Sequence, residues 1–216
     1  MTGAQLLDDF LESQPRGHHK SHRKLAKLVR EAYPIGVPAL IMKSSTDRLG
    51  ASAGYSFHLG TPDEILRRIA SWLFTMAGER QVVLCKLIPA LWNRHGREDV
   101  ALAALIIANL DHKRLDINPW EVLASSINDA EPAEALLLSI EELLRAGHAE
   151  PSKELLRVWC RGRLVESHLA LISSFASSKR GRPIEEDVVS LLTSVEIPNE
   201  DSLLRRIRDR FVTGIP

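Results

Sequence analysis

The chain has 216 residues, which is enough for one large domain or two small ones and for a sizeable buried core. Hydrophobic residues make up 44% of the chain and charged residues 26%, as is ordinary for a soluble globular protein. The formal net charge is zero, so the total charge does not indicate a partner. The distribution of charge along the chain is the informative feature.

The sequence predicts a cytoplasmic protein without a membrane segment. Residues 1–13 form an acidic amphipathic stretch, not a signal peptide. The most apolar run, 100–110, is too short to cross a bilayer and is typical of a helix buried on nearly all sides. Cys85 and Cys160 both lie in helical, apolar contexts, so we expect reduced core thiols.

Residues 1–60 are expected to form an irregular helical cap. Short helices are predicted over 2–13, 18–33 and 39–50, and the stretch 51–60, with its glycines and serines, is the best candidate for a loop or hinge. Terminal units of repeat proteins are commonly atypical, which suits a cap of this kind.

A strongly basic run lies within this cap. Residues 15–30 contain six lysines or arginines, three histidines and no acid. Such a run is either a solvated helix face or a surface that faces phosphate. Its histidines, His18, His19 and His22, have no neighbouring carboxylate or cysteine to complete a metal site, so we expect no metal there.

From Thr61 onward, signals that open a helix recur about every 34 residues. Thr61, Pro62 and Glu64 form the first, a capping-box pattern. The later openings lie at 96–99, 131–134, 164–166 and 198–201, and shorter second helices open at 118–121, 150–152 and 182–185.

The period predicts an all-α fold, because no segment shows the sustained alternation of a strand. We expect an α-α superhelix of HEAT-like or armadillo-type repeats, with about ten to twelve helices in antiparallel pairs. The repeats occupy 61–216 and form a single solenoid with the cap. Such stacks curve into an extended binding surface, which favours a large ligand such as nucleic acid or another protein.

Standard catalytic and cofactor signatures are missing from the sequence, so no cofactor is expected. Cys160 and His168 lie eight residues apart in sequence, and a core cysteine beside a surface histidine is the favoured interpretation over a nucleophile pair.

The loop 179–183, Lys-Arg-Gly-Arg-Pro, resembles an AT-hook. Gly181 removes a side chain that would meet the floor of the minor groove, and the flanking arginines suit its negative potential. Acidic residues follow at 185–187, and Pro183 also opens a helix, so a simple turn between helices is the alternative.

Basic and aromatic residues in the last three units predict a groove for DNA. Arginines surround Trp159 and crowd the final helix, and Trp120, at the second position of its helix, is placed to project into such a groove. The candidate DNA-contacting residues are Trp120, Trp159, Arg161, Arg163, His168, Lys179, Arg180, Arg182, Arg205 and Arg206.

In the order and spacing of these elements, the chain resembles the DNA alkylation repair family of AlkD-like HEAT-repeat glycosylases. The similar elements are the helix opening at 79–82, the Trp-acid pair at 120–121, the tryptophan helix at 155–159, the following helix at 164–173, the arginine-rich last helix and the turn at 35–38. The resemblance implies a solenoid that holds duplex DNA and excises N3- or N7-alkylated purines.

This chain matches only some of the residues that the family has in its cleft. Trp120 falls at the position of the family's aromatic residue, whereas its aspartate falls on Ala124, its arginine on His168 and its second tryptophan near Arg206. A glycosylase needs a carboxylate near the glycosidic bond, because positive charge develops on the sugar.

Glu121 and Asp129 are the candidates for that carboxylate. The first hypothesis is therefore a DNA-binding protein of this type, active or degenerate. The alternative is a scaffold that binds a protein partner in the concave groove.

Overall fold

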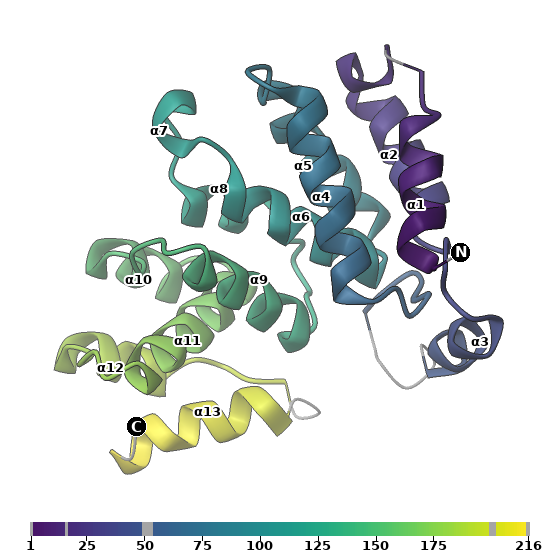
Figure 1. Cartoon of the computed structure of the whole chain (residues 1–216). Coiled ribbons are helices and arrows are strands. Elements are labelled where there is room, and N and C mark those ends of the chain that lie inside the picture. The colour runs from purple at the N-terminus through teal and green to yellow at the C-terminus, as the bar shows by residue number, and fades with distance from the viewer. Residues whose placement is uncertain (1, 16, 49–53, 199–201, 215–216) are drawn as a thin grey trace. The chain divides into compact units, whose positions relative to one another are not determined.

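The computed structural model describes residues 2–15, 17–48, 54–198 and 202–214. All regular structure in these ranges is helical (Figure 1). It comprises thirteen α-helices and one short 3-10 helix, η1. The all-α prediction is therefore confirmed. Three sets of residues named in the sequence analysis lie outside the described ranges: 199–201 of the expected opening at 198–201, 49–53 of the predicted helix 39–50 and the loop candidate after it, and Arg16 of the basic run.

The chain divides into two compact units, Met1–Pro119 and Trp120–Pro216. The division thus falls between the first two residues of helix α8, and not near residue 60 as the expected cap implies. Residues 54–60 have no helix, as predicted, but they are bound to the following helices: the Ser56 amide donates to the carbonyl of His95 (2.8 Å), and the Arg97 amide donates to that of Phe57 (2.9 Å).

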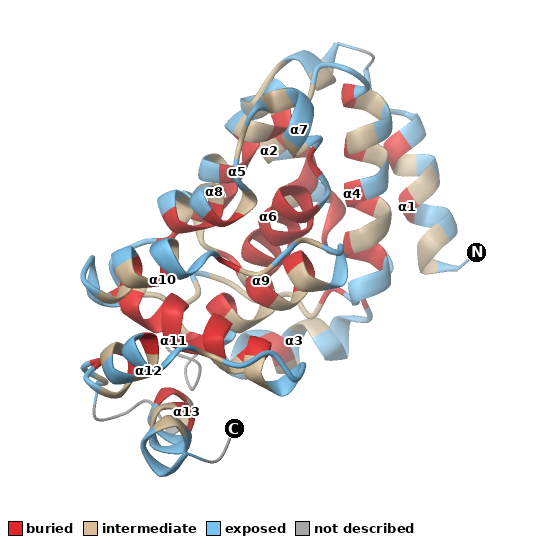
Figure 2. Ribbon diagram, turned by 90° about the vertical axis from the view of Figure 1, so that its left-hand side faces the viewer, coloured by how far each residue is buried: buried red, intermediate tan, exposed pale blue. Residues whose placement is uncertain are grey.

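The N-terminal unit is built around helix α6. All eleven residues from Glu98 to Ala108 are buried (Figure 2), which confirms the prediction of a helix buried on nearly all sides. Helices α4 and α5 pack against α6, and α2 packs against α5. The helices of this unit are α1 (Gly3–Glu12), η1 (His18–Lys20), α2 (His22–Ala32), α3 (Ala39–Arg48), α4 (Asp63–Ala77), α5 (Val82–Arg94), α6 (Arg97–Asn109) and α7 (His112–Leu115).

Buried polar groups join the ends of three helices in this unit. The fully buried carboxylate of Asp99, in the first turn of α6, accepts hydrogen bonds from the Tyr33 hydroxyl (2.8 Å) and from Nε of Arg94 (2.7 Å). Arg94 also donates to the carbonyl of Ala26 (2.6 Å). Burial and the neighbouring Asp99 carboxylate raise the pKa of Tyr33 well above its usual value, so the hydroxyl keeps its proton.

Thr61 forms hydrogen bonds beside these buried polar groups and does not cap α4. Its hydroxyl donates to the carbonyl of Tyr33 (3.0 Å), and its amide donates to the buried Glu98 carboxylate (3.3 Å). Helix α4 begins at Asp63 after Pro62, with no capping bond from a side chain. The predicted capping box is therefore wrong, because a tertiary contact occupies the hydroxyl that would have formed it.

The C-terminal unit consists of stacked helix pairs. Helix α11 packs against both α9 and α13, while α10 packs against α11 and α12. The starts of α9 and α11 match the predicted openings. The helices are α8 (Pro119–Ser126, all but its first residue in this unit), α9 (Ala133–Arg145), α10 (Lys153–Cys160), α11 (Leu164–Lys179), α12 (Glu186–Thr193) and α13 (Ser202–Thr213).

Candidate nucleic-acid interface

The two tryptophans expected to contact DNA are core residues. Trp120 is 3% exposed and Trp159 is 2% exposed, and their rings meet edge to face with centroids 6.4 Å apart. The indole N–H of Trp120 donates to the carbonyl of Ala149 (2.7 Å), which satisfies its polar atom inside the unit. The expectation that Trp120 projects into a groove is therefore wrong.

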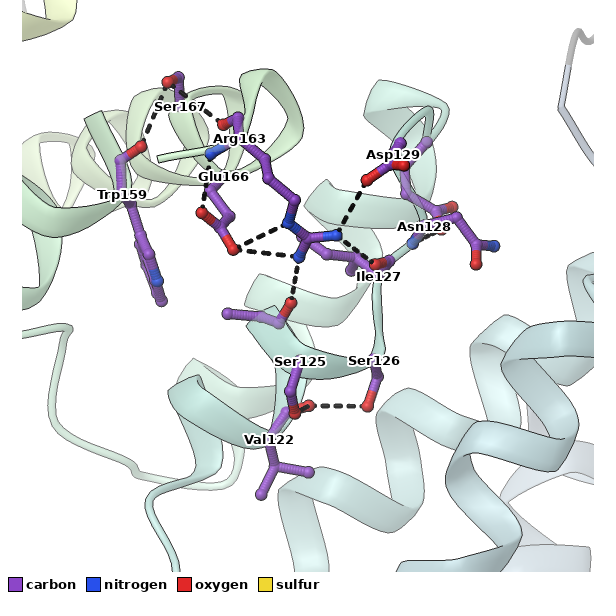
Figure 3. A network of polar contacts seen from close by, with 12 residues as sticks. Val122, Ser125, Ser126, Ile127, Asn128, Asp129, Trp159, Arg163, Glu166 and Ser167 are labelled. Carbon is purple, nitrogen blue, oxygen red and sulfur yellow. Dashed lines mark hydrogen bonds and ion pairs between the residues drawn. The ribbon is translucent and has the colours of Figure 1, made fainter. Parts of the chain in front are cut away.

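Arg163 is a structural residue of the C-terminal unit (Figure 3). Its guanidinium donates to the carbonyls of Ala124 (2.8 Å) and Ile127 (3.2 Å), and so satisfies carbonyls at and just after the C-terminal end of α8. The same group contacts the carboxylates of Asp129 (3.2 Å) and Glu166 (3.0 Å). These contacts fix the loop after α8 to the start of α11.

The two carboxylates proposed for catalysis do not face a pocket together with Trp120. Asp129 is 91% exposed and contacts Arg163, while Glu121 lies exposed on α8. Ala124, where the family's aspartate falls, contributes its backbone carbonyl to Arg163. Glu121 and Asp129 therefore do not place a buried carboxylate beside an accessible Trp120 ring.

Most other cations of this unit are held by carboxylates. Arg157 contacts Asp187 (2.7 Å) and Glu185 (3.3 Å), two of the acids that follow the loop 179–183, which we call the hook-like loop. Within that loop, Arg180 pairs with Glu141 (2.9 Å) and Arg182 with Glu150 (3.2 Å). Because Arg157, Arg180 and Arg182 each have a negative partner, the net field that these side chains offer to phosphate is reduced.

The remaining candidates of this unit differ in exposure. His168 is 6% exposed, and its Nε2 lies 2.9 Å from the carbonyl of Glu196, so it packs in the core and does not contact Cys160 through that atom. The Lys179 ammonium lies 5.6 Å from the centroid of the Phe175 ring. Four of the remaining candidates are exposed, as Arg163, Arg180 and Arg182 are too: Arg161, Lys179, Arg205 and Arg206.

A different cluster of cations lies in the N-terminal unit, in a cavity of about 340 Å³ that we call the basic pocket. No acid is among its lining residues. The residues that line it are His19, Lys20, His22, Arg80, Val82, Val83 and Lys86. Among the described residues, none of Lys20, Arg80 and Lys86 forms an ion pair.

The fold creates this pocket by bringing distant segments together. η1 and the first residue of α2 supply His19, Lys20 and His22, while the turn before α5 supplies Arg80. Lys86 comes from the second turn of α5, which packs against α2. The N-terminal ends of two helices thus lie at the pocket, and the positive ends of their dipoles add to the side-chain charges.

The sequence identified three of the seven residues that line this pocket. The basic run 15–30 contains His19, Lys20 and His22, and the phosphate-facing alternative for that run fits the pocket. Arg80 and Lys86 were missed, because only the packing of α5 against α2 places them there.

Cys85 and Cys160 are free and half-buried, and burial raises the pKa of both thiols. Within the described ranges, no three metal-ligating side chains gather into a possible metal site. Nor does any described helix combine the length and apolarity needed to span a membrane.

Comparisons with protein-family models, with characterised proteins and with solved structures find no match to this chain.

Proposed function

We propose that this chain is a DNA-binding helical-repeat protein that holds the backbone of duplex DNA at the basic pocket of its N-terminal unit. One observation supports this most strongly: three cations and two histidines line a single pocket without an acid, at the starts of two helices. The order and spacing of the helices, which resemble those of alkylation-repair proteins, favour DNA as the source of the phosphate.

The chemistry of the pocket suits a phosphodiester. Arg80 provides a planar group that bonds two phosphate oxygens at once, while Lys20 and Lys86 provide compact charges. His19 and His22 each carry a ring N–H donor even when neutral. Because contacts to phosphate carry no sequence information, we expect the binding to be independent of DNA sequence.

We propose binding of DNA without excision of a base. A glycosylase stabilises positive charge on the deoxyribose with a carboxylate beside the flipped nucleotide. Glu121 and Asp129 are exposed, and the Trp120 ring is enclosed by its own unit. We therefore propose a cytoplasmic protein related in function to DNA repair that binds duplex DNA without excising an alkylated purine.

Equilibrium binding to a duplex at about 50 and about 200 mM salt tests the proposal. We expect binding at the lower concentration that weakens strongly at the higher one, because phosphate contacts release counterions. Incubation with DNA that contains N3-methyladenine or N7-methylguanine should release no free base. Absence of binding at the lower salt concentration would refute DNA binding, and release of either base would refute the non-excising part.

The alternative, a module that binds another protein, is favoured by a separate observation in the C-terminal unit. Apolar pockets lie beside α13 there.

A further inference from the structure

An apolar pocket of about 390 Å³ lies beside α13 in the C-terminal unit, and we call it the first pocket. The end of α11, the loop before α12, α12 itself and the end of α13 all contribute to it. Its main lining residues are Phe175, Pro183, Ile184, Val189, Arg210 and Phe211. Volumes of this size are typical of sites that receive a ligand or a large side chain.

A second pocket, of about 420 Å³, adjoins the first. It is lined by Leu203 and Ile207 of α13, and it shares Phe175 and Arg210 with the first pocket. The two hollows therefore lie on either side of a common wall made by these two residues. This arrangement suits a chain that inserts one apolar side chain into each hollow better than it suits a single compact molecule.

The common wall is cationic. The Arg210 guanidinium lies 5.4 Å from the centroid of the Phe175 ring, and the Lys179 ammonium lies 5.6 Å from the same centroid. Arg182, which also lines the first pocket, is already paired with Glu150. Arg210 forms no ion pair within the described part of the chain, so it is the group available to a carboxylate of a ligand.

We propose that these two pockets bind a peptide segment of another protein, with a large apolar side chain in each pocket and an acidic residue between them that contacts Arg210. Charge complementarity supports an acidic segment, because Arg210 lines both pockets and forms no ion pair with a described residue, and no acid lines the first pocket. The one acid of the second pocket, Asp209, contacts Arg208 (3.4 Å). The apolar walls would leave a nucleic-acid backbone without partners, which makes a protein segment the better match.

The site is separate from the basic pocket, so the inference does not depend on DNA binding. Together, the two sites would let the protein bring a partner with an acidic, apolar motif to a nucleic acid.

Selection from a displayed library of short random peptides on the full chain tests this inference. We expect enriched peptides to share an acidic residue flanked by large apolar residues. Selection on the Arg210→Gln and Phe175→Ala variants should lose this enrichment, while Arg161→Gln, an exposed arginine at the end of α10, should keep it. Circular dichroism of each variant checks that the helices are retained, and Arg210→Gln keeps the test decisive if Phe175→Ala fails to fold.

One enriched peptide and its acid-to-amide counterpart complete the test by fluorescence anisotropy. On the wild-type chain we expect the amide peptide to bind about tenfold more weakly, because a charge-assisted hydrogen bond is lost. On Arg210→Gln the two peptides should bind alike, as a double-mutant cycle requires for a direct contact. No enrichment, enrichment of peptides without an acid, or unchanged binding to Arg210→Gln would each overturn the proposal. Concentration-dependent dimerisation of the chain that Arg210→Gln abolishes would instead assign the surface to a second copy, and would also overturn it.

Discussion

Removal of one cation from the basic pocket should change how DNA binding depends on salt. Three side chains of the pocket, Lys20, Arg80 and Lys86, carry a full positive charge and form no ion pair within the described part of the chain. If each neutralises one phosphate, the logarithm of the binding constant falls with the logarithm of salt concentration with a slope of about −2.7. Binding then weakens about 40-fold between about 50 and about 200 mM salt.

The variant Lys86→Gln should lower the magnitude of that slope to about 1.8, so that the same change in salt weakens binding only about 12-fold. Fluorescence anisotropy with a labelled duplex at several salt concentrations measures the slope directly. Arg180→Gln is the matched control, because Arg180 lies in the hook-like loop and is paired with Glu141. A slope that changes with Arg180→Gln and not with Lys86→Gln would refute the reasoning and return the interface to the C-terminal unit.

Three further predictions concern the N-terminal unit. Asp99→Ala leaves buried polar partners without their acceptor, so the free energy of unfolding in urea should fall by about 3–5 kcal/mol. Tyr33→Phe removes only one of these hydrogen bonds and should lower it by about 1 kcal/mol. Equal losses for the two variants would contradict the central role of Asp99. Gly96→Ala should lower the melting temperature, since an added Cβ would lie 2.0 Å from an atom of the Phe57 ring, and an unchanged melting temperature would show that the ring moves freely. Burial raises the pKa of Cys85, so its alkylation rate should still be increasing above the pH at which an exposed thiol levels off, as a pH series with mass spectrometry would show.

The helices could be predicted because their signals are local. The spacing of helix openings and apolar faces predicted the starts of α9 and α11, and the strongly apolar run 100–110 identified a helix enclosed by its neighbours. Thr61 shows where local signals fail: its sequence context is that of a cap, but a contact with Tyr33, distant in sequence, uses the same hydroxyl.

The candidate site could be predicted only where one segment supplies it. Lys20 belongs to a run whose charge is visible in the sequence, whereas Lys86 joins the pocket through the packing of two helices. In the C-terminal unit, by contrast, the sequence predicted cations for DNA binding that the structure pairs with carboxylates. Arg163 and Arg180 are clustered with other cations in sequence, yet folding brings Asp129 to Arg163 and Glu141 to Arg180. Counting positive residues along a chain cannot reveal partners that come from other helices.

Lysine footprinting tests the central claim most directly. The chain is treated with an amine-acetylating reagent with and without duplex DNA at low salt, and acetylation at each lysine is measured by mass spectrometry. Binding at the basic pocket predicts that DNA protects Lys20 and Lys86 but leaves Lys153 and Lys179 of the C-terminal unit unchanged. Protection of Lys153 and Lys179 with Lys20 and Lys86 unchanged would contradict the proposed interface.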